Sequence, residues 1–194
     1  SRPIVRAAQL PQRYSITSNL ITAELDALPA WLAEQSIEKE TDAWVYVRLP
    51  NASSTVYETA IKHLSMLRPD LNLIAAWDAP ESVNEFIRGR HLTQAALLAK
   101  TDLVRQSEQE YWFAACHDET SIVQAVKLGV DAITLSAVLA TPTHPDSQPL
   151  GWDGFAQLAK LSDVPVYALG GLQPNDLTEA QANGGFGIAG MRFI

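Results

Sequence analysis

The sequence is short of cysteine and of positive charge. Its single cysteine, Cys116, excludes an internal disulfide framework and suits a reducing compartment such as the cytoplasm. Lys and Arg together number 14 against 22 Asp and Glu, which gives a formal net charge of −8. Because nucleic acids and anionic membrane surfaces bind clusters of Lys and Arg, this balance argues against both as partners.

Long apolar runs and the common cofactor signatures are also missing. No stretch approaches the roughly 20 apolar residues that span a bilayer, and we expect no signal peptide. The sequence has no GxGxxG, Walker A or GxSxG motif. One cysteine cannot build a thiolate zinc site, and the histidines lack metal-ligand spacing; they are His63, His91, His117 and His144.

What the chain does have is a regular alternation of strand and helix patterns. Its 194 residues, 47% of them hydrophobic, suffice for a proper core. Eight strand patterns separated by helical stretches predict parallel βα units, and the late strands are apolar enough to be covered on both faces. Strands are expected at 13–17, 43–49, 71–77, 89–92, 111–116, 132–138, 164–169 and 187–194, and helices at 23–38, 53–68, 81–87, 120–128, 152–161 and 173–183.

This order predicts an α/β fold, and it is compatible with a minimal (β/α)₈ TIM barrel that lacks its last helix. About 24 residues per unit is short for a barrel but sufficient. A doubly wound open sheet is the structural rival, because periodicity does not separate the two. We interpret residues 1–11 as an arm or linker remnant and residues 12–194 as one barrel domain, whose flank beside the first and last strands an arm or a neighbour would cover.

Three features near strand ends are candidates for chemistry. Gly170 and Gly171 end the seventh strand and Gly190 lies in the eighth; glycines there let backbone N–H groups approach a phosphate, although a tight turn explains them equally well. His117 ends the fifth strand and is suited to proton transfer, while adjacent Cys116 should face the opposite way. An isolated capping histidine is the plain alternative. The loop after the sixth strand offers Thr141, Thr143 and His144 for an anionic group, or is merely a proline-stiffened connection.

Several motifs in order resemble one known family. CH at 116–117, GVDA at 129–132, TPTH at 141–144, LGW at 150–152 and PVYALGG at 165–171 are similar to motifs of the thiamine phosphate synthase/TenI superfamily. GRHLTQ at 89–94 and Arg48 extend the similarity toward the N-terminus. The resemblance covers nearly all the chain after the arm and implies a TIM barrel.

The resemblance also implies which residues would meet substrate. A synthase of this family joins a pyrimidine diphosphate to a thiazole phosphate with magnesium. Its two lysines correspond here to Pro50 and His144, its Asn-Asp pair to Trp77 and Asp78, and a further aspartate to Ala96. Both lysines and one of two metal carboxylates are thus absent. The implied substrate-binding residues are Arg48, Trp77, Asp78, Ser136, Thr141, Thr143 and His144, and the implied phosphate-binding residues are Gly170, Gly171, Gly190 and Arg192.

The TenI branch of the superfamily is more similar in this respect. Its members are thiazole tautomerases with a histidine at the position of His117, which implies an acid/base role and no cofactor. Magnesium would be needed only if synthase activity is retained. The expected partner is a small phosphorylated heterocycle, and a homodimer or a covalently fused Nudix domain remains open. The alternatives are a thiamine phosphate synthase and a non-catalytic domain that binds a phosphorylated ligand.

Overall fold

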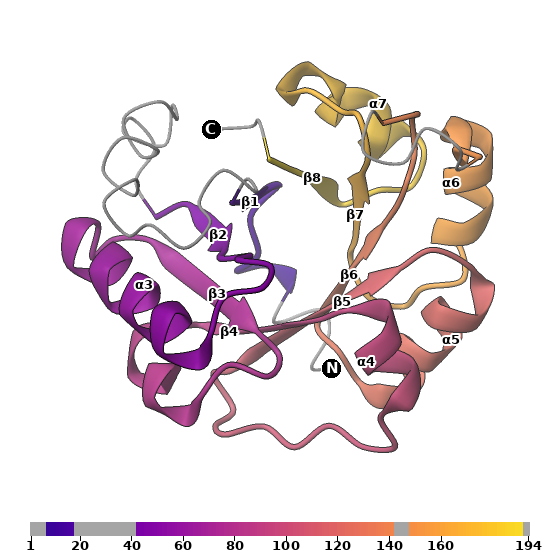
Figure 1. Ribbon diagram of the computed structural model, residues 1–194. Coiled ribbons are helices and arrows are strands. Elements are labelled where there is room, and N and C mark those ends of the chain that lie inside the picture. Colours follow the sequence, from indigo (N-terminus) through magenta and orange to yellow (C-terminus); the bar gives the residue numbers. More distant parts are fainter. Residues whose placement is uncertain (1–6, 18–41, 142–147, 192–194) are drawn as a thin grey trace.

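Eight parallel strands close into a barrel in sequence order (Figure 1). The computed structural model describes residues 7–17, 42–141 and 148–191. The first strand pairs with the last, with Tyr14 opposite Ala189, so the sheet has no edge. This closure confirms the TIM barrel and excludes the doubly wound sheet. The strands are β1 (Arg13–Ile16), β2 (Trp44–Tyr46), β3 (Asn72–Ala76), β4 (Gly89–Leu92), β5 (Tyr111–Cys116), β6 (Ala132–Leu135), β7 (Val166–Leu169) and β8 (Gly187–Gly190).

Helices lie outside the strands (Figure 1). Two differ from the sequence prediction: a six-residue helix follows β4 where none was predicted, and the helix predicted over 173–183 divides into a 3₁₀ turn and a short α-helix. The helix predicted over 23–38 lies outside the described residues. The described helices are α3 (Ser54–Leu67), η3 (Glu81–Phe86), α4 (Gln94–Ala99), α5 (Glu119–Leu128), α6 (Gly151–Ala159), η4 (Pro174–Asp176) and α7 (Leu177–Ala182).

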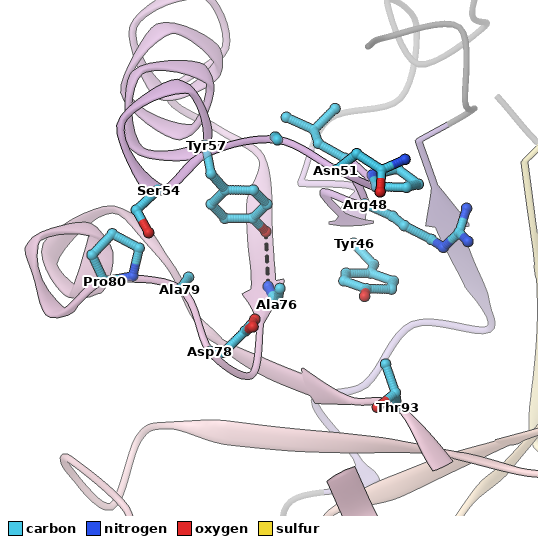
Figure 2. A pocket seen from close by; sticks show the side chains of 13 residues that line it. Tyr46, Arg48, Asn51, Ser54, Tyr57, Ala76, Asp78, Ala79, Pro80 and Thr93 are labelled. Atoms are coloured by element: carbon cyan, nitrogen blue, oxygen red, sulfur yellow. Dashed lines mark hydrogen bonds between the residues drawn. The ribbon is translucent and has the colours of Figure 1, made fainter. Parts of the chain in front are cut away.

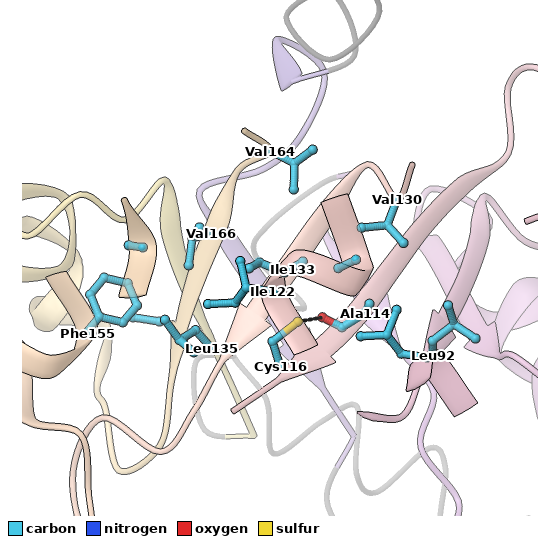
Figure 3. Packing of buried hydrophobic residues seen from close by; sticks show 14 of the residues in the cluster. Leu92, Ala114, Cys116, Ile122, Val130, Ile133, Leu135, Phe155, Val164 and Val166 are labelled. Carbon is cyan, nitrogen blue, oxygen red and sulfur yellow. Dashed lines mark hydrogen bonds between the residues drawn. The ribbon is translucent and has the colours of Figure 1, made fainter. Parts of the chain in front are cut away.

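The hydrophobic core lies on both sides of the strands. On the outer side, two clusters fill the space between the strands and the helices. The outward side chains of β4 to β8 meet α4 to α7 in one aliphatic cluster that includes Cys116, Ile122, Leu135 and Phe155 (Figure 3). A second cluster joins β2 and β3 to α3. Burial of these apolar side chains, at about 25 cal/mol per Å², holds the helices against the barrel.

The barrel interior is filled mainly by aromatic rings rather than by the branched aliphatic residues usual in this fold. The rings of Tyr14 and Phe113 stack with their centroids 4.5 Å apart, and Tyr167 tilts against both. Aromatic pairs at such separations add to the stability that burial alone provides. Trp44 and Tyr111 continue the packing toward the beginnings of the strands.

The segment before β1 packs against this same end of the barrel. Leu10 is buried with the interior cluster, and the hydroxyl of Tyr167 donates to the carbonyl of Pro11. The hydroxyl of Tyr111 donates to Gln9 Oε1 over 2.6 Å. Residues 7–12 therefore contact the barrel directly. The domain boundary at residue 11 stays a prediction.

One buried histidine belongs to the aromatic interior. His91 is 4% exposed, its ring lies 4.2 Å from that of Tyr46 in a stacked arrangement, and its Nδ1 is 3.0 Å from the hydroxyl of Tyr14. Burial, together with a smaller effect of the positive charge of Arg48, lowers the pKa of His91 from its ordinary value of 6.5 to about 3. The folded barrel therefore keeps this imidazole neutral.

This burial makes stability depend on pH. Between pH 6.5 and 3 the unfolded chain binds a proton at His91 that the folded chain does not, so stability falls as the pH falls through that window. Relative to His91→Phe, we expect the wild-type protein to lose about 1.4 kcal/mol more per pH unit between pH 6 and 4. Urea unfolding at several pH values measures this slope. Tyr14→Phe, which keeps the imidazole, should retain the wild-type slope, and identical slopes for wild type and His91→Phe would contradict the assignment.

Candidate functional site

The predicted site residues that the structure describes gather at the carboxyl ends of the strands. Arg48 follows β2, Asp78 follows β3, His117 follows β5 and Ser136 follows β6. Gly170 follows β7 directly. In TIM barrels this end carries the active site, because the loops there come from all eight strands and meet around one axis.

His117 is held by the strand beside its own. Its Nδ1 lies 3.0 Å from the carbonyl oxygen of Ser136 and 3.0 Å from the Ser136 hydroxyl. Because a carbonyl oxygen only accepts, the bond to it requires the proton on Nδ1, which leaves the lone pair on Nε2. The side chain is exposed, so Nε2 can meet a ligand at the barrel mouth.

The backbone around His117 is fixed by the start of α5. The side chain of Asp118 accepts from the backbone N–H of Ser121 over 2.9 Å, and the Ser121 hydroxyl accepts from the N–H groups of His117 and Asp118. This reciprocal capping box begins the helix immediately after the strand, and Gly129 in the left-handed conformation ends it. The strand end therefore presents His117 in one position.

Cys116 is not a second reactive group at this position. Its side chain points outward into the aliphatic cluster, away from His117, as the alternation along a strand predicts. Burial raises the pKa of its thiol to about 12, so the thiolate needed for nucleophilic attack is disfavoured.

The glycines after β7 are required by close packing with the loop after β6. Gly170 has φ of 118°, and a Cβ there would lie 2.8 Å from Ala137 Cα. Gly171 has φ of 69°, and its Cβ would lie 3.0 Å from the carbonyl oxygen of Ala140. Gly190 is buried in β8, where it pairs with Ser15. Packing thus explains the first two glycines by itself, and their phosphate-binding role stays a proposal.

A cavity of about 350 Å³ opens at the ends of β2, β3 and β4 (Figure 2). Arg48 supplies a positive charge to its lining and Asp78 a negative one. Tyr57 joins its two walls, because its hydroxyl donates to the carbonyl of Val47 over 2.6 Å and accepts from the N–H of Ala76 over 2.7 Å. Tyr46 also lines the cavity, and burial raises the pKa of its hydroxyl to about 12.

The structure brings some predicted residues together and separates others. Arg48 and Asp78 share the cavity, but Trp77 does not line it. Trp77 is 37% exposed, and its ring centroid lies 5.6 Å from Lys100 Nζ. Thr141 is half-buried. Thr143, His144 and Arg192 lie outside the described residues. The sequence did not identify Tyr46 and Tyr57 as cavity residues. Tyr46 lies in an apolar strand pattern and Tyr57 on the apolar face of a helical pattern, so both resembled core residues.

The described residues do not form a magnesium site built by the protein. Asp78 is the carboxylate in the cavity, and Ala96 faces the aliphatic cluster. Over 7–17, 42–141 and 148–191, no three His, Cys, Asp or Glu side chains lie together as metal ligands would. Magnesium normally takes one or two carboxylates together with substrate phosphates, and Asp78 is the carboxylate that the cavity lining offers. Over the same ranges, no helix has the length and apolarity to cross a membrane.

The fold and the site together define a (β/α)₈-barrel protein with its polar side chains at the carboxyl ends of the strands. The sequence model of one family, thiamine monophosphate synthase, matches residues 33–194. The chain therefore belongs to the thiamine monophosphate synthase family.

Curated relatives match in part. A protein of Aquifex aeolicus named "Putative thiamine-phosphate synthase 2" is 38% identical over 77 residues, which are 40% of this chain and 41% of the relative. The thiamine-phosphate synthase of Chloroflexus aurantiacus is 30% identical over 76 residues, 39% of this chain and 35% of the relative. The matched segment thus spans about two fifths or less of these relatives' length.

Solved structures agree on the fold. A thiamine phosphate pyrophosphorylase from Pyrococcus furiosus superposes with a TM-score of 0.65 at 19% identity, covering 95% of this chain and 86% of that one. A 3-hexulose-6-phosphate synthase superposes with a TM-score of 0.62 at 15% identity, covering 93% of this chain and 89% of that one. At such identities the likeness concerns the fold alone.

The close packing at Gly170 is testable by substitution. We expect Gly170→Ala to destabilise the barrel by about 2–4 kcal/mol, because the new Cβ meets backbone atoms of Ala137 and Val138 at a φ that alanine rarely adopts. Gly154→Ala is the matched control: in α6 its Cβ would lie 3.4 Å from Leu150 Cβ, and it should stabilise by about 0.5–1 kcal/mol. Chemical denaturation compares the two, and equal stabilities would refute the packing argument.

Proposed function

We propose that the barrel binds a phosphorylated thiazole and catalyses a proton shift on it, as the thiazole tautomerases of this superfamily do. The observation that carries the proposal is the Nδ1 contact of His117 with the Ser136 carbonyl, which leaves Nε2 as a base at the barrel mouth. A tautomerisation needs one group to take a proton from the substrate and give a proton back at another atom. In this proposal His117 performs both halves of that transfer.

The proposed chemistry needs no co-reactant. Nε2 accepts the proton from the substrate, the electron pair left behind moves into the thiazole system, and the imidazolium returns a proton elsewhere on the same molecule. The contact with Ser136 orients the ring and stabilises the imidazolium, because Nδ1–H keeps its acceptor throughout. Gly170, Gly171 and Gly190, with Arg192, are the proposed phosphate anchor. No cofactor is required.

Thiamine phosphate synthesis is the second candidate. The names of the relatives favour it, as does a cavity that brings Arg48 and Asp78 together where a second substrate would sit. Against it stand Pro50 and Ala96, which supply neither the positive charge nor the carboxylate of the family pattern. A pyrimidine diphosphate with magnesium carries several charges, and their burial is costly unless they are matched. This candidate, unlike the first, requires magnesium.

Replacing His117 tests the tautomerase proposal. We expect His117→Gln to slow conversion of the carboxythiazole phosphate by at least about 100-fold, because general acid–base catalysis contributes on that scale. Ser136→Ala should have a smaller effect, because the backbone carbonyl that orients the ring remains. The rate is followed by NMR of the substrate. His63→Gln, on α3, is the control and should keep the wild-type rate. An unchanged rate in His117→Gln would contradict the acid/base role of His117, and a wild-type rate equal to that without protein, with ligand still bound, would indicate a non-catalytic binding domain.

Ligand-dependent stability separates the two enzymes. We expect the thiazole phosphate alone to stabilise the protein, by about 2.7 kcal/mol when its concentration is 100 times the dissociation constant. Adding pyrimidine diphosphate and magnesium should increase this little. Thermal unfolding measures the stabilisation, and an assay with both substrates and magnesium runs in parallel. Robust formation of thiamine phosphate would replace the tautomerase proposal with the synthase.

A further inference from the structure

Arg90 is a buried cation within the GRHLTQ stretch, and the sequence alone assigned it no role. It lies in β4 beside His91, on the outward face of the strand, and is 6% exposed. The guanidinium donates to five neutral oxygens of residues 76–84, which precede β4: the carbonyls of Ala76 (3.3 Å), Trp77 (3.2 Å) and Ala79 (2.7 Å) from Nη1, and the Pro80 carbonyl (3.4 Å) and Asn84 Oδ1 (2.7 Å) from Nη2.

The segment that these bonds hold is one wall of the cavity. Residues 76–80 connect β3 to η3, and Ala76, Asp78, Ala79 and Pro80 all line the cavity. The carbonyl of Trp77 belongs to the peptide group before Asp78, the carbonyl of Ala79 belongs to the peptide group after Ala79, and both accept from the same Nη1. The backbone on both sides of Asp78 is therefore bonded to one nitrogen atom.

The carbonyl groups of this segment need hydrogen-bond donors, and the Arg90 guanidinium needs acceptors. Carbonyl groups that converge in a poorly hydrated place repel one another and lose water, so each needs a donor. The planar guanidinium provides several donors in a fixed fork, which a single ammonium does not. Without it, the carbonyls around Asp78 lose their shared donor and the segment must rearrange.

The end of this segment nearest β3 is held by a separate hydrogen bond to Tyr57. The N–H of Ala76 donates to the hydroxyl of Tyr57, while the carbonyl of Ala76 accepts from Arg90 (Figure 2 shows the first bond). Tyr57 thus fixes where the segment leaves β3. It does not contact the peptide groups beside Asp78. Two backbone bonds also hold them, since the N–H of Ala79 donates to the carbonyl of Ala76 over 3.1 Å and that of Trp77 to the carbonyl of His91 over 3.0 Å. Arg90 supplies the side-chain donor to the carbonyls of Trp77 and Ala79.

We infer that Arg90 is the positioning residue of this cavity: it acts through the loop backbone to hold Asp78 where a ligand meets it. Arg90 itself does not line the cavity, so its role is to shape the wall and not to bind. The inference concerns the loop and requires neither proposed reaction.

Amide hydrogen exchange of Arg90→Ala tests the inference. The N–H groups of Trp77, Ala79 and Val83 are hydrogen-bonded in the folded loop. We expect them to exchange at least about tenfold faster in Arg90→Ala, while amides of β5 and β6 keep their rates. Guanidinium ion at millimolar concentration should slow them again and move the Asp78 amide NMR signal back toward its wild-type position, because the ion can occupy the vacated fork site.

Further variants separate positioning from charge and bulk. Arg90→Lys keeps the positive charge but not the planar guanidinium. Its loop amides should therefore exchange as fast as those of Arg90→Ala, and guanidinium ion should not slow their exchange. Arg88→Ala, two residues away and in contact with Trp44 and Tyr111 instead, is the matched control and should resemble wild type in the loop. If Arg90→Ala does not fold, Asn84→Ala removes one acceptor alone and should speed the same amides several-fold.

Three results would overturn the inference. Unchanged exchange of the loop amides in Arg90→Ala or Asn84→Ala would show that the loop keeps its structure without the hydrogen bonds to Arg90. Equally faster amide exchange in all strands would show a general loss of stability. Failure of guanidinium ion to slow exchange of the loop amides would show that the Arg90 guanidinium does not hold the loop. None of these results bears on His117, so the tautomerase proposal stands or falls separately.

Discussion

The hydrogen-bond ladder between β1 and β8 is the constraint on which the rest depends, because it turns eight short strands into a closed barrel. Each described strand has only three to six residues, and none is a stable unit by itself. Closure gives every strand two partners and leaves no edge to protect. It also brings the residues that follow β2, β3, β5, β6 and β7 to one end, although they lie far apart in the sequence.

The mouth of this barrel has two unlike halves. Beyond β5, β6 and β7 the backbone is closely packed: the capping box fixes His117, the Ser136 carbonyl orients it, and Gly170 and Gly171 lie against the next loop. Beyond β2, β3 and β4 there is instead a cavity whose charged lining consists of Arg48 and Asp78. One half is suited to orient a small group precisely and the other to receive a larger part of a ligand. This asymmetry is why the proton-transfer proposal rests on the first half.

The sequence predicted the parts of the molecule that depend on local pattern. The bounds of β4 and β5 agree with prediction, and in β5 the apolar run of residues 111–116 lies between Glu110 and His117. The strand predicted over 132–138 ends at Leu135, because the chain after it packs on Gly170, a contact invisible in one segment. Helix α4 was missed because six residues are too few to show a helical period. His117 could be placed at a strand end, but its bond to the Ser136 carbonyl depends on β6. Arg90 gave no signal, since its acceptors lie six to fourteen residues away along the chain.

The aromatic interior also limits how such a barrel can diverge. Tyr14, His91, Phe113 and Tyr167 come from four different strands and share a single enclosed volume. A larger or smaller ring at one position changes the space left for the other three, so substitutions there are coupled and not additive. Change inside the barrel therefore comes in matched sets across several strands, whereas the loops at the mouth can vary one at a time. A lineage with this interior would find new chemistry more readily at the mouth than by remodelling its centre.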